Sequence, residues 1–160
     1  MDKAPIVPEP LKDIIIRRFE AGREERAVYA VIAEAFPDID GKPYREYEDW
    51  YKGIFEKSSS FEPEMLYVAV ADGEIVGTTL CRIYPEDRAG YIWQVAVRRN
   101  WRRRGIALQL LLTAFGEYYR RGMPNVQLSV NKENPTGAHM LYAQAGMRRR
   151  SQIDSLSKDL

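Results

Sequence analysis

Apolar positions in the first third of the chain follow the spacing of one short strand and two helices. The run Ile14–Arg18 is rich in β-branched residues and predicts a strand. Between residues 24 and 36, apolar side chains recur every three or four positions, as on one face of a helix, and Pro37 should end that helix. Residues 44–55 repeat this spacing and predict a second helix, which is followed by a serine-rich loop at 58–60.

The rest of the chain begins with the shorter apolar runs that are typical of strands. Residues 65–71 and 75–83 are two such runs, and the Asp72-Gly73 dipeptide between them favours a tight hairpin turn. A polar turn at 85–88 then leads to a third run at 91–97. The remaining predicted elements are a helix from Ile106 to about Gly122, a strand at 126–130, a helix at 135–145 and a last strand from Arg148.

This order predicts an α+β fold, in which helices flank a mostly antiparallel sheet with a late strand–helix–strand unit. A length of 160 residues, 45% of them hydrophobic and 29% charged, is typical of one globular domain. No run approaches the roughly 18 apolar residues that span a membrane, and residues 1–10 do not resemble a secretory signal. We expect a flexible lead-in over residues 1–12 and a single domain over residues 13–160.

Cysteine and histidine are too scarce for several kinds of site. The one cysteine, Cys81, excludes an internal disulfide and favours the reducing cytoplasm. The one histidine, His139, argues against a His-rich zinc site. We therefore expect no metal.

Charge is divided unevenly along the chain. Residues 1–97 carry a net charge of −7 and residues 98–160 carry +8, although the whole chain carries only +1. The basic second part indicates an anionic partner, either nucleic acid or a phosphorylated small molecule, unless this charge is ordinary solvated surface. The acidic first part argues against nucleic acid, because modules that bind it are usually basic along a whole face.

An arginine-rich turn precedes the longest predicted helix. The first turn of a helix has backbone N–H groups without acceptors and a partial positive charge, so it can hold a phosphate. Gly105 allows the backbone to turn sharply there, and the small Ala107 leaves room for the anion. Charge-assisted hydrogen bonds can be added by Arg102, Arg103 and Arg104. The alternative is a basic helix N-terminus that is held by packing alone.

A second group of polar and aromatic residues follows the strand at 126–130. Asn134 is placed to cap the next helix, with Pro135 at the first helical position. Tyr142 lies two turns along that helix, where a core aromatic is the ordinary interpretation, and Gly146 closes it. Capping by Asn134 is compatible with binding of a ligand by its side chain.

Together these two segments resemble the GNAT superfamily of N-acetyltransferases. Arg102-x-x-Gly105-x-Ala107 is similar to the acetyl-CoA motif of that superfamily. The stretch from Asn134-Pro-Thr-Gly-Ala through Leu-Tyr142 to Gly-Met147 is similar to its second motif, which usually ends in Gly-Phe. The resemblance covers the chain from about residue 65 to its end and extends more weakly to the two N-terminal helices.

The resemblance implies the acyl-CoA N-acyltransferase (GNAT) fold, whose central strands splay apart to admit the pantetheine arm of acetyl-CoA. The strand at 95–97 would present backbone groups to that arm and an N–H to the thioester carbonyl. Residues 103–108 would hold the pyrophosphate, and the side chain at 134 would lie near the thiol end. The residues implied in binding acetyl-CoA are Val95, Ala96, Val97, Arg102, Arg103, Arg104, Gly105, Ile106, Ala107, Leu108 and Asn134.

The implied reaction is direct attack of a primary amine, of a small molecule or a peptide, on the thioester. Tyr142 would be the general acid for the departing thiolate. Many relatives place a glutamate base at the positions that match Tyr91 or Ser129, and neither residue is a carboxylate here. The base is then a carboxylate elsewhere, such as Glu86 or Asp87, or a water molecule, and the sequence leaves this open.

The acceptor is less well defined by the sequence. The N-terminal helices and their loop commonly wall the acceptor side of this fold, so Asp38, Tyr44, Tyr47 and Trp50 are candidates. Residues 35–50 and 61–69 also faintly resemble the mycothiol synthase branch, which acetylates a cysteinyl amine on an amino sugar. The acidic first part of the chain would suit a cationic acceptor equally well.

Two other functions stay open from the sequence. A nucleic-acid-binding module would use the arginines between 98 and 104, with Trp101 stacking on bases. A non-catalytic sensor would bind acetyl-CoA without turnover. Neither the identity of the amine nor the existence of a homodimer follows from the sequence, and we expect no membrane partner.

Overall fold

A seven-stranded sheet forms the centre of the computed structural model, which describes residues 9–57, 62–129, 138–149 and 155–159. The strand order is β1-β2-β3-β4-β5-β7-β6, and neighbouring strands are antiparallel except β4 and β5, which are parallel. The strands are β1 (Ile14–Arg18), β2 (Tyr67–Ala71), β3 (Glu74–Tyr84), β4 (Ala89–Val97), β5 (Asn125–Ser129), β6 (Arg148–Arg149) and β7 (Ser155–Asp159).

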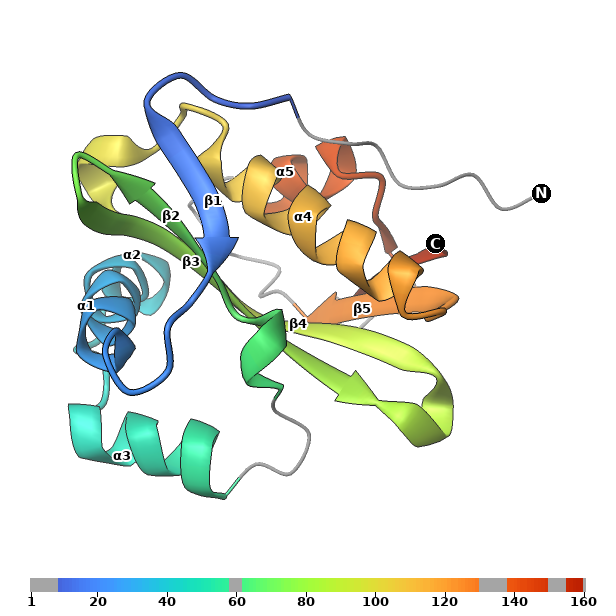
Figure 1. Cartoon of the computed structure of the whole chain (residues 1–160), viewed down its shortest axis with the longest axis horizontal. Helices are drawn as coiled ribbons and strands as arrows, with labels where there is room; N and C mark the ends of the chain where they lie inside the picture. Colours follow the sequence, from blue (N-terminus) through green and yellow to red (C-terminus); the bar gives the residue numbers. More distant parts are fainter. Residues whose placement is uncertain (1–8, 58–61, 130–137, 150–154, 160) are drawn as a thin grey trace.

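Helices cover both faces of this sheet (Figure 1). α1 and α3 pack on one face, and α4 and α5 pack on the other. The helices are α1 (Glu25–Ala35), α2 (Pro37–Asp40), α3 (Tyr47–Tyr51), α4 (Ile106–Arg120) and α5 (Ala138–Gln144), with short turns at η1 (Lys52–Glu56), η2 (Pro63–Met65), η3 (Pro85–Asp87) and η4 (Arg99–Trp101). No helix in the described ranges is both long and apolar enough to cross a membrane.

The structure confirms the α+β fold and its mostly antiparallel sheet, but the second expected helix is shorter than its sequence pattern. Helix α3 begins only at Tyr47, because tertiary hydrogen bonds hold the preceding segment outside the helix. The Tyr29 hydroxyl donates to the Arg45 carbonyl at 2.7 Å, and the Gln94 amide donates to the Tyr44 hydroxyl at 2.8 Å. The helix then ends in the π-helical turn η1.

Two proline-containing segments also differ from expectation. Pro37 ends α1, as expected, but it is also the first residue of the short helix α2, since the fixed φ of proline suits the first helical position. Met65 was expected within a strand and instead ends the 3₁₀ turn η2, which starts at Pro63, so that β2 begins two residues later.

Separate hydrophobic cores form on the two faces of the sheet. Leu110 and Phe115 of α4 are fully buried in one of them. Val28 and Ile32 of α1 are fully buried in the other, together with Trp50 of α3. Burial of a large apolar side chain stabilises a fold by roughly 1.5 to 3 kcal/mol, so these helices hold the sheet rigidly from both sides.

Strands β4 and β5 separate after a short contact, as the GNAT fold implies. They pair only over residues 89–91 and 125–127, while β4 continues to Val97. A β-bulge follows at once, because Leu80 faces Gln94 whereas Cys81 faces Ile92, which leaves Trp93 as the extra residue. Such a bulge bends and twists a strand. Over the rest of β4, no described residue of β5 pairs with the edge that faces it.

The C-terminal part of α4 fastens the point where these strands still meet. The Tyr118 hydroxyl lies 2.9 Å from the carbonyl oxygen of Arg82 and 3.1 Å from that of Tyr91, and it can donate to either. A Cβ atom on Gly90 would overlap the Tyr118 ring, so only glycine permits this close approach of helix and strand.

Glu117 lies beside this contact among three arginines. Its side chain is only 9% exposed and accepts hydrogen bonds from Arg120 and Arg121, each at 2.9 Å from Nε, and from Arg18 at 3.2 Å. The hydrogen bonds from Arg120, and then those from Arg121, lower the pKa of Glu117 from 4.5 to about 2. The folded state therefore favours the carboxylate form.

We expect Glu117→Gln to lower the free energy of unfolding at pH 7 by about 1 to 3 kcal/mol, because ion pairs with arginines are replaced by hydrogen bonds to an uncharged amide oxygen. Since the pKa is lower in the folded state, this contribution is complete above pH 4.5 and is lost as the pH falls towards 2. Urea unfolding at several pH values measures it. An equal difference between variant and wild type at pH 7 and pH 3 would contradict the assignment, and Glu86→Gln on an exposed turn is the control.

Candidate active site

Two residues in left-handed conformations shape the turn between β4 and α4. Arg103 has a φ of 62° and Gly105 a φ of 83°. Ordinary side chains rarely adopt this region, whereas glycine does so without steric cost. A Cβ atom on Gly105 would meet only Leu11, at an ordinary 3.7 Å, so the backbone conformation rather than crowding explains the glycine. The turn brings the chain directly to the start of α4.

The N-terminus of α4 has the donor arrangement that the sequence predicts. Gly105 is its N-cap residue, and no side chain caps the helix. The first helical hydrogen bond runs from the Gln109 N–H to the Gly105 carbonyl at 3.0 Å, so the N–H groups of the preceding residues have no acceptor within the helix. Ile106 is buried beneath them, while Ala107 and Leu108 are partly buried against the core of α4. These donors and the helix dipole can hold an anion.

Three arginines of the turn point towards α1 and α2. Arg99 and Arg102 share the carboxylate of Asp38, at 3.0 Å and 2.7 Å. These two guanidinium groups lower the pKa of Asp38. Arg98 lies 3.5 Å from Glu34. The structure therefore places Arg102, expected to contact the pyrophosphate, in an ion pair that ties the turn to α2.

The other two arginines of the turn are exposed. The Arg104 guanidinium lies 4.7 Å from the centre of the Trp101 ring, and this pair borders a cavity of about 430 Å³ that Leu11 and Asp72 also line. Arg103 makes no ion pair with the described part of the chain. Of the three arginines expected at the pyrophosphate, Arg103 and Arg104 thus have side chains that remain available to a ligand.

The last residues of β4 alternate between the two cores. Val95 and Val97 face α4, whereas Ala96 faces α1. All three pair with β3 on one side. Their other edge pairs with no described strand, so the backbone groups predicted to contact the pantetheine arm lie on the edge of β4 that leads to the start of α4.

Tyr142 lies on α5, on the same side of the sheet as α4. It is partly buried against the core of α4, and removal from water raises the pKa of its phenol to about 12. The helix ends at Gln144 and is followed at Gly146 by a left-handed residue with a φ of 86°. The N–H groups of Met147 and Gly146 donate to the carbonyls of Tyr142 and Ala143, each at 2.9 Å, which is a Schellman motif. Asn134 and the side chain of Ser129 lie outside what the structure describes.

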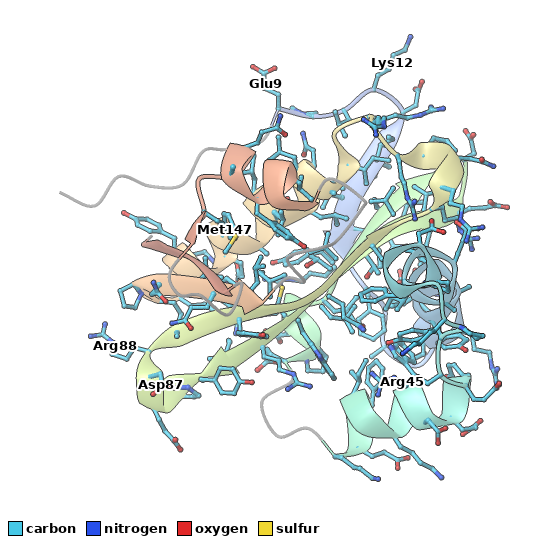
Figure 2. All side chains as sticks on the ribbon, turned by 180° about the vertical axis from the view of Figure 1, so that it is seen from behind. Glu9, Lys12, Arg45, Asp87, Arg88 and Met147 are labelled. Atoms are coloured by element: carbon cyan, nitrogen blue, oxygen red, sulfur yellow. The ribbon has the colours of Figure 1, made fainter. Side chains whose placement is uncertain are left out.

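The family's base position at Tyr91 and the candidate carboxylates Glu86 and Asp87 lie in different parts of the β3–β4 hairpin. Tyr91 is partly buried, and its ring packs edge-on against Tyr84 with centroids 6.1 Å apart. Glu86 and Asp87 are exposed in η3, and Asp87 projects from the tip of the β3–β4 hairpin (Figure 2). At about 3.3 Å per residue, this tip lies roughly 25 Å from Val97, too far for proton transfer at the end of β4.

On the opposite face of the sheet, the expected acceptor wall is largely an aromatic cluster. Trp50 is fully buried, and Tyr29 and Tyr47 have ring centres within 6 Å of it. The Tyr44 hydroxyl reaches β4 at Gln94. Asp38, in contrast, is held by its arginine pairs. Sequence reasoning missed Gln94, because an amide within an apolar strand has no distinctive spacing.

The comparisons with known proteins agree on one family. Residues 26–147 match the model of the acetyltransferase (GNAT) family. The mycothiol acetyltransferase of Streptomyces bingchenggensis is 29% identical over 133 residues, which are 80% of this chain and 42% of that protein. The mycothiol acetyltransferase of Acidothermus cellulolyticus is 30% identical over 91% of this chain and 48% of that protein. The chain therefore spans about half the length of these curated relatives.

Solved structures give the same result for the fold. A GCN5-related N-acetyltransferase from Sphaerobacter thermophilus has a TM-score of 0.81 and 40% identity, over 99% of this chain and 49% of that chain. The PaiA N-acetyltransferase from Thermoplasma acidophilum, solved in complex with coenzyme A, has a TM-score of 0.72 and 18% identity, over 92% of this chain and 99% of that chain.

A pair of glycine substitutions tests the conformation at the start of α4. Gly105→Ala should lower the free energy of unfolding by about 1 kcal/mol, because its φ of 83° is unfavourable for alanine. Gly116→Ala, in the middle of α4 with open space around its Cβ, should raise it by about 0.5 to 1 kcal/mol. Urea unfolding measures both. Effects of the same sign would contradict the left-handed turn.

Proposed function

The chain belongs to the acetyltransferase (GNAT) family, and we propose that it transfers the acetyl group of acetyl-CoA to a primary amine of a small molecule or peptide by direct attack. The observation that supports this proposal is the N-terminus of α4, whose N–H donors are not capped by a side chain. They lie next to Arg103 and Arg104, which make no ion pair with a described residue, and to the part of β4 that pairs with no described residue of β5. The mycothiol acetyltransferase relatives support an acyl transfer, and the coenzyme A complex of a fold neighbour supports the choice of donor.

The first step in our proposal is binding of the pyrophosphate at α4. The N–H groups of residues 105–108 would bind its oxygens, and Arg103 and Arg104 would add charge-assisted hydrogen bonds. Arg102 would act indirectly, because its ion pair with Asp38 and its 3.1 Å hydrogen bond to the Val97 carbonyl fix the turn relative to β4. The backbone of Arg102 would still lie next to the pyrophosphate.

The thioester would then lie along the edge of β4. Backbone groups of residues 95–97 would pair with the pantetheine amides, and a backbone N–H would hold the oxyanion that develops at the carbonyl. A fixed donor of this kind contributes roughly 3 to 4 kcal/mol to lowering the barrier of acyl transfer. Asn134, by its position in the second motif, would contact the thiol end.

Tyr142 would hold the proton for the departing thiolate. Its pKa of about 12 keeps the phenol protonated throughout the range in which an amine is neutral enough to attack. The carboxylates next to the end of β4, Glu34 and Asp38, are held in ion pairs with arginines of the turn, so in our proposal the attacking amine would lose its proton to water. The single cysteine is a buried free thiol, in keeping with a cytoplasmic site for this reaction.

The two alternatives, an acetyl-CoA sensor and a nucleic-acid-binding module, would respond differently to ligands. A sensor would bind acetyl-CoA without acetylating any amine. A nucleic-acid-binding module would bind nucleic acid in a strongly salt-dependent manner and ignore coenzyme A. The pairing of Arg98, Arg99 and Arg102 with Glu34 and Asp38 weakens the latter, because it removes three of five arginines from the proposed basic patch.

Calorimetry and thermal-shift measurements test whether acetyl-CoA, the proposed acetyl donor, binds. We expect binding and an increase in Tm. Arg103→Gln and Arg104→Gln should each weaken binding by about 5- to 20-fold, because each removes one exposed charge-assisted contact. Arg88→Gln, which removes an equally exposed charge from the tip of the β3–β4 hairpin, is the matched control and should bind as the wild type does. If well-folded protein takes up no acetyl-CoA, the proposal fails.

The substitution Tyr142→Phe tests whether Tyr142 is the general acid. Because the phenol would act only as the thiol departs, we expect kcat to fall by about 10²- to 10⁴-fold with little change in the Kd of acetyl-CoA. Release of coenzyme A over a panel of amines, amino sugars and peptides measures this. Turnover close to that of the wild type would exclude Tyr142 from the mechanism.

A further inference from the structure

Three buried polar side-chain atoms lack a hydrogen-bond partner in the described part of the chain: Trp50 Nε1, Arg82 Nε and Gln94 Oε1. The large majority of buried side-chain polar atoms in folded proteins are paired, so each exception calls for an explanation. All three side chains lie on the face of the sheet that α1 and α3 cover. Trp50 and Gln94 contact the aromatic cluster there, and Arg82 lies between Cys81 and Ile83, which both face α4.

Arg82 and Gln94 adjoin the bulge at Trp93. The Arg82 guanidinium is stacked over the Trp93 ring, 3.2 Å from its centre. Gln94 is the next residue along β4, only 6% exposed, and its amide nitrogen donates to the Tyr44 hydroxyl. The indole covers one face of the guanidinium, and the Nε–H on its edge is buried without a hydrogen-bond acceptor in the described part of the chain. Arg82 makes no ion pair with any described residue, although it is partly buried.

The position of these groups relates them to the reaction. Tyr142 and the N-terminus of α4 lie on one face of the sheet, and in the proposed function they hold acetyl-CoA there, which leaves the other face to the acceptor. Trp93 and Gln94 are on that other face, and Gln94 immediately precedes the segment 95–97. The unpaired atoms therefore adjoin the route of the acceptor.

We propose that Arg82, Trp93 and Gln94 form an acceptor subsite, and that the acceptor amine carries an anionic oxygen group, a carboxylate or a phosphate. This inference rests on the proposed function. Nε–H and the neighbouring Nη–H of Arg82 bind two oxygens of the anion side by side, in the geometry that guanidinium groups prefer. Gln94 Oε1 accepts a hydrogen bond from the amine N–H and orients its lone pair towards the thioester.

Pairs of acceptors that differ only in an anionic group test whether the enzyme prefers that group. The carboxylate series runs from glycine to 6-aminohexanoate, each compound beside its primary amide, and phosphoethanolamine beside ethanolamine represents phosphate. We expect kcat/KM to be at least tenfold higher for the anionic member of at least one pair, and the pair that shows it identifies carboxylate or phosphate. Equal or better use of every neutral member would overturn the proposal.

Substitutions of Arg82 test whether this residue causes the preference for an anionic acceptor. Arg82→Gln should lower kcat/KM for the preferred anionic acceptor by about 10- to 100-fold, mainly through KM, and leave its neutral counterpart within about twofold. Arg82→Lys should restore only part of the preference, because lysine lacks the side-by-side donors. Arg88→Gln, on the same hairpin but at its exposed tip, should behave as the wild type. Equal losses on both members of the pair would show a structural role for Arg82 and overturn the proposal.

A binding measurement separates failure of this subsite from failure of the proposed function. Because Arg82 covers the Trp93 indole, the preferred anionic acceptor should change the tryptophan fluorescence of the wild type, with and without coenzyme A, but not that of Trp93→Phe. Calorimetry with acetyl-CoA on the same Arg82→Gln protein should give the wild-type Kd. Intact acetyl-CoA binding with no anion preference overturns the subsite alone, whereas loss of acetyl-CoA binding in the wild type overturns the proposed function.

Discussion

The arrangement of the site depends on how little of β4 and β5 pair. Parallel hydrogen bonding holds the two strands together over three residues of each, and Tyr118 and Gly90 fix α4 against that short contact. Beyond it, the bulge at Trp93 turns β4 away. Had the pairing continued to Val97, the backbone groups of residues 95–97 would be used within the sheet. Because it stops, no described strand pairs with this edge beside the N-terminus of α4, and the Val97 carbonyl accepts a hydrogen bond from Arg102 instead.

Sequence patterns predicted the elements whose formation is local. Alternation and the Asp72-Gly73 turn identify the β2–β3 hairpin, since both turn residues adopt the positive φ that such a turn requires. The start of α4 at Gly105 follows from equally local chemistry. Long-range contacts account for what was missed. The late start of α3 depends on hydrogen bonds from Tyr29 and Gln94, which no spacing within residues 44–55 reveals.

The same distinction applies within the arginine-rich turn. Five arginines in seven residues suggest a single anion-binding cluster, but they divide according to partners more than 60 positions away in the chain. Asp38 and Glu34 neutralise those that point towards α1 and α2, and this pairing makes the turn a rigid support. Of the five, only Arg103 and Arg104 make no ion pair with a described carboxylate. A motif thus gives the composition of a site, while the fold decides which members reach the ligand.

The two ends of helix α4 make different contacts, and the helix links them mechanically. Its 15 residues form a rod of about 22 Å that carries open amides at one end and the Tyr118 clamp at the other. Because the helix is continuous, we expect ordering of its first turn to steady also the Arg82–Tyr91 pair of the β3–β4 hairpin. Hydrogen–deuterium exchange should therefore slow at Arg82 and Tyr91 when an anion occupies the far end, with no displacement of either strand.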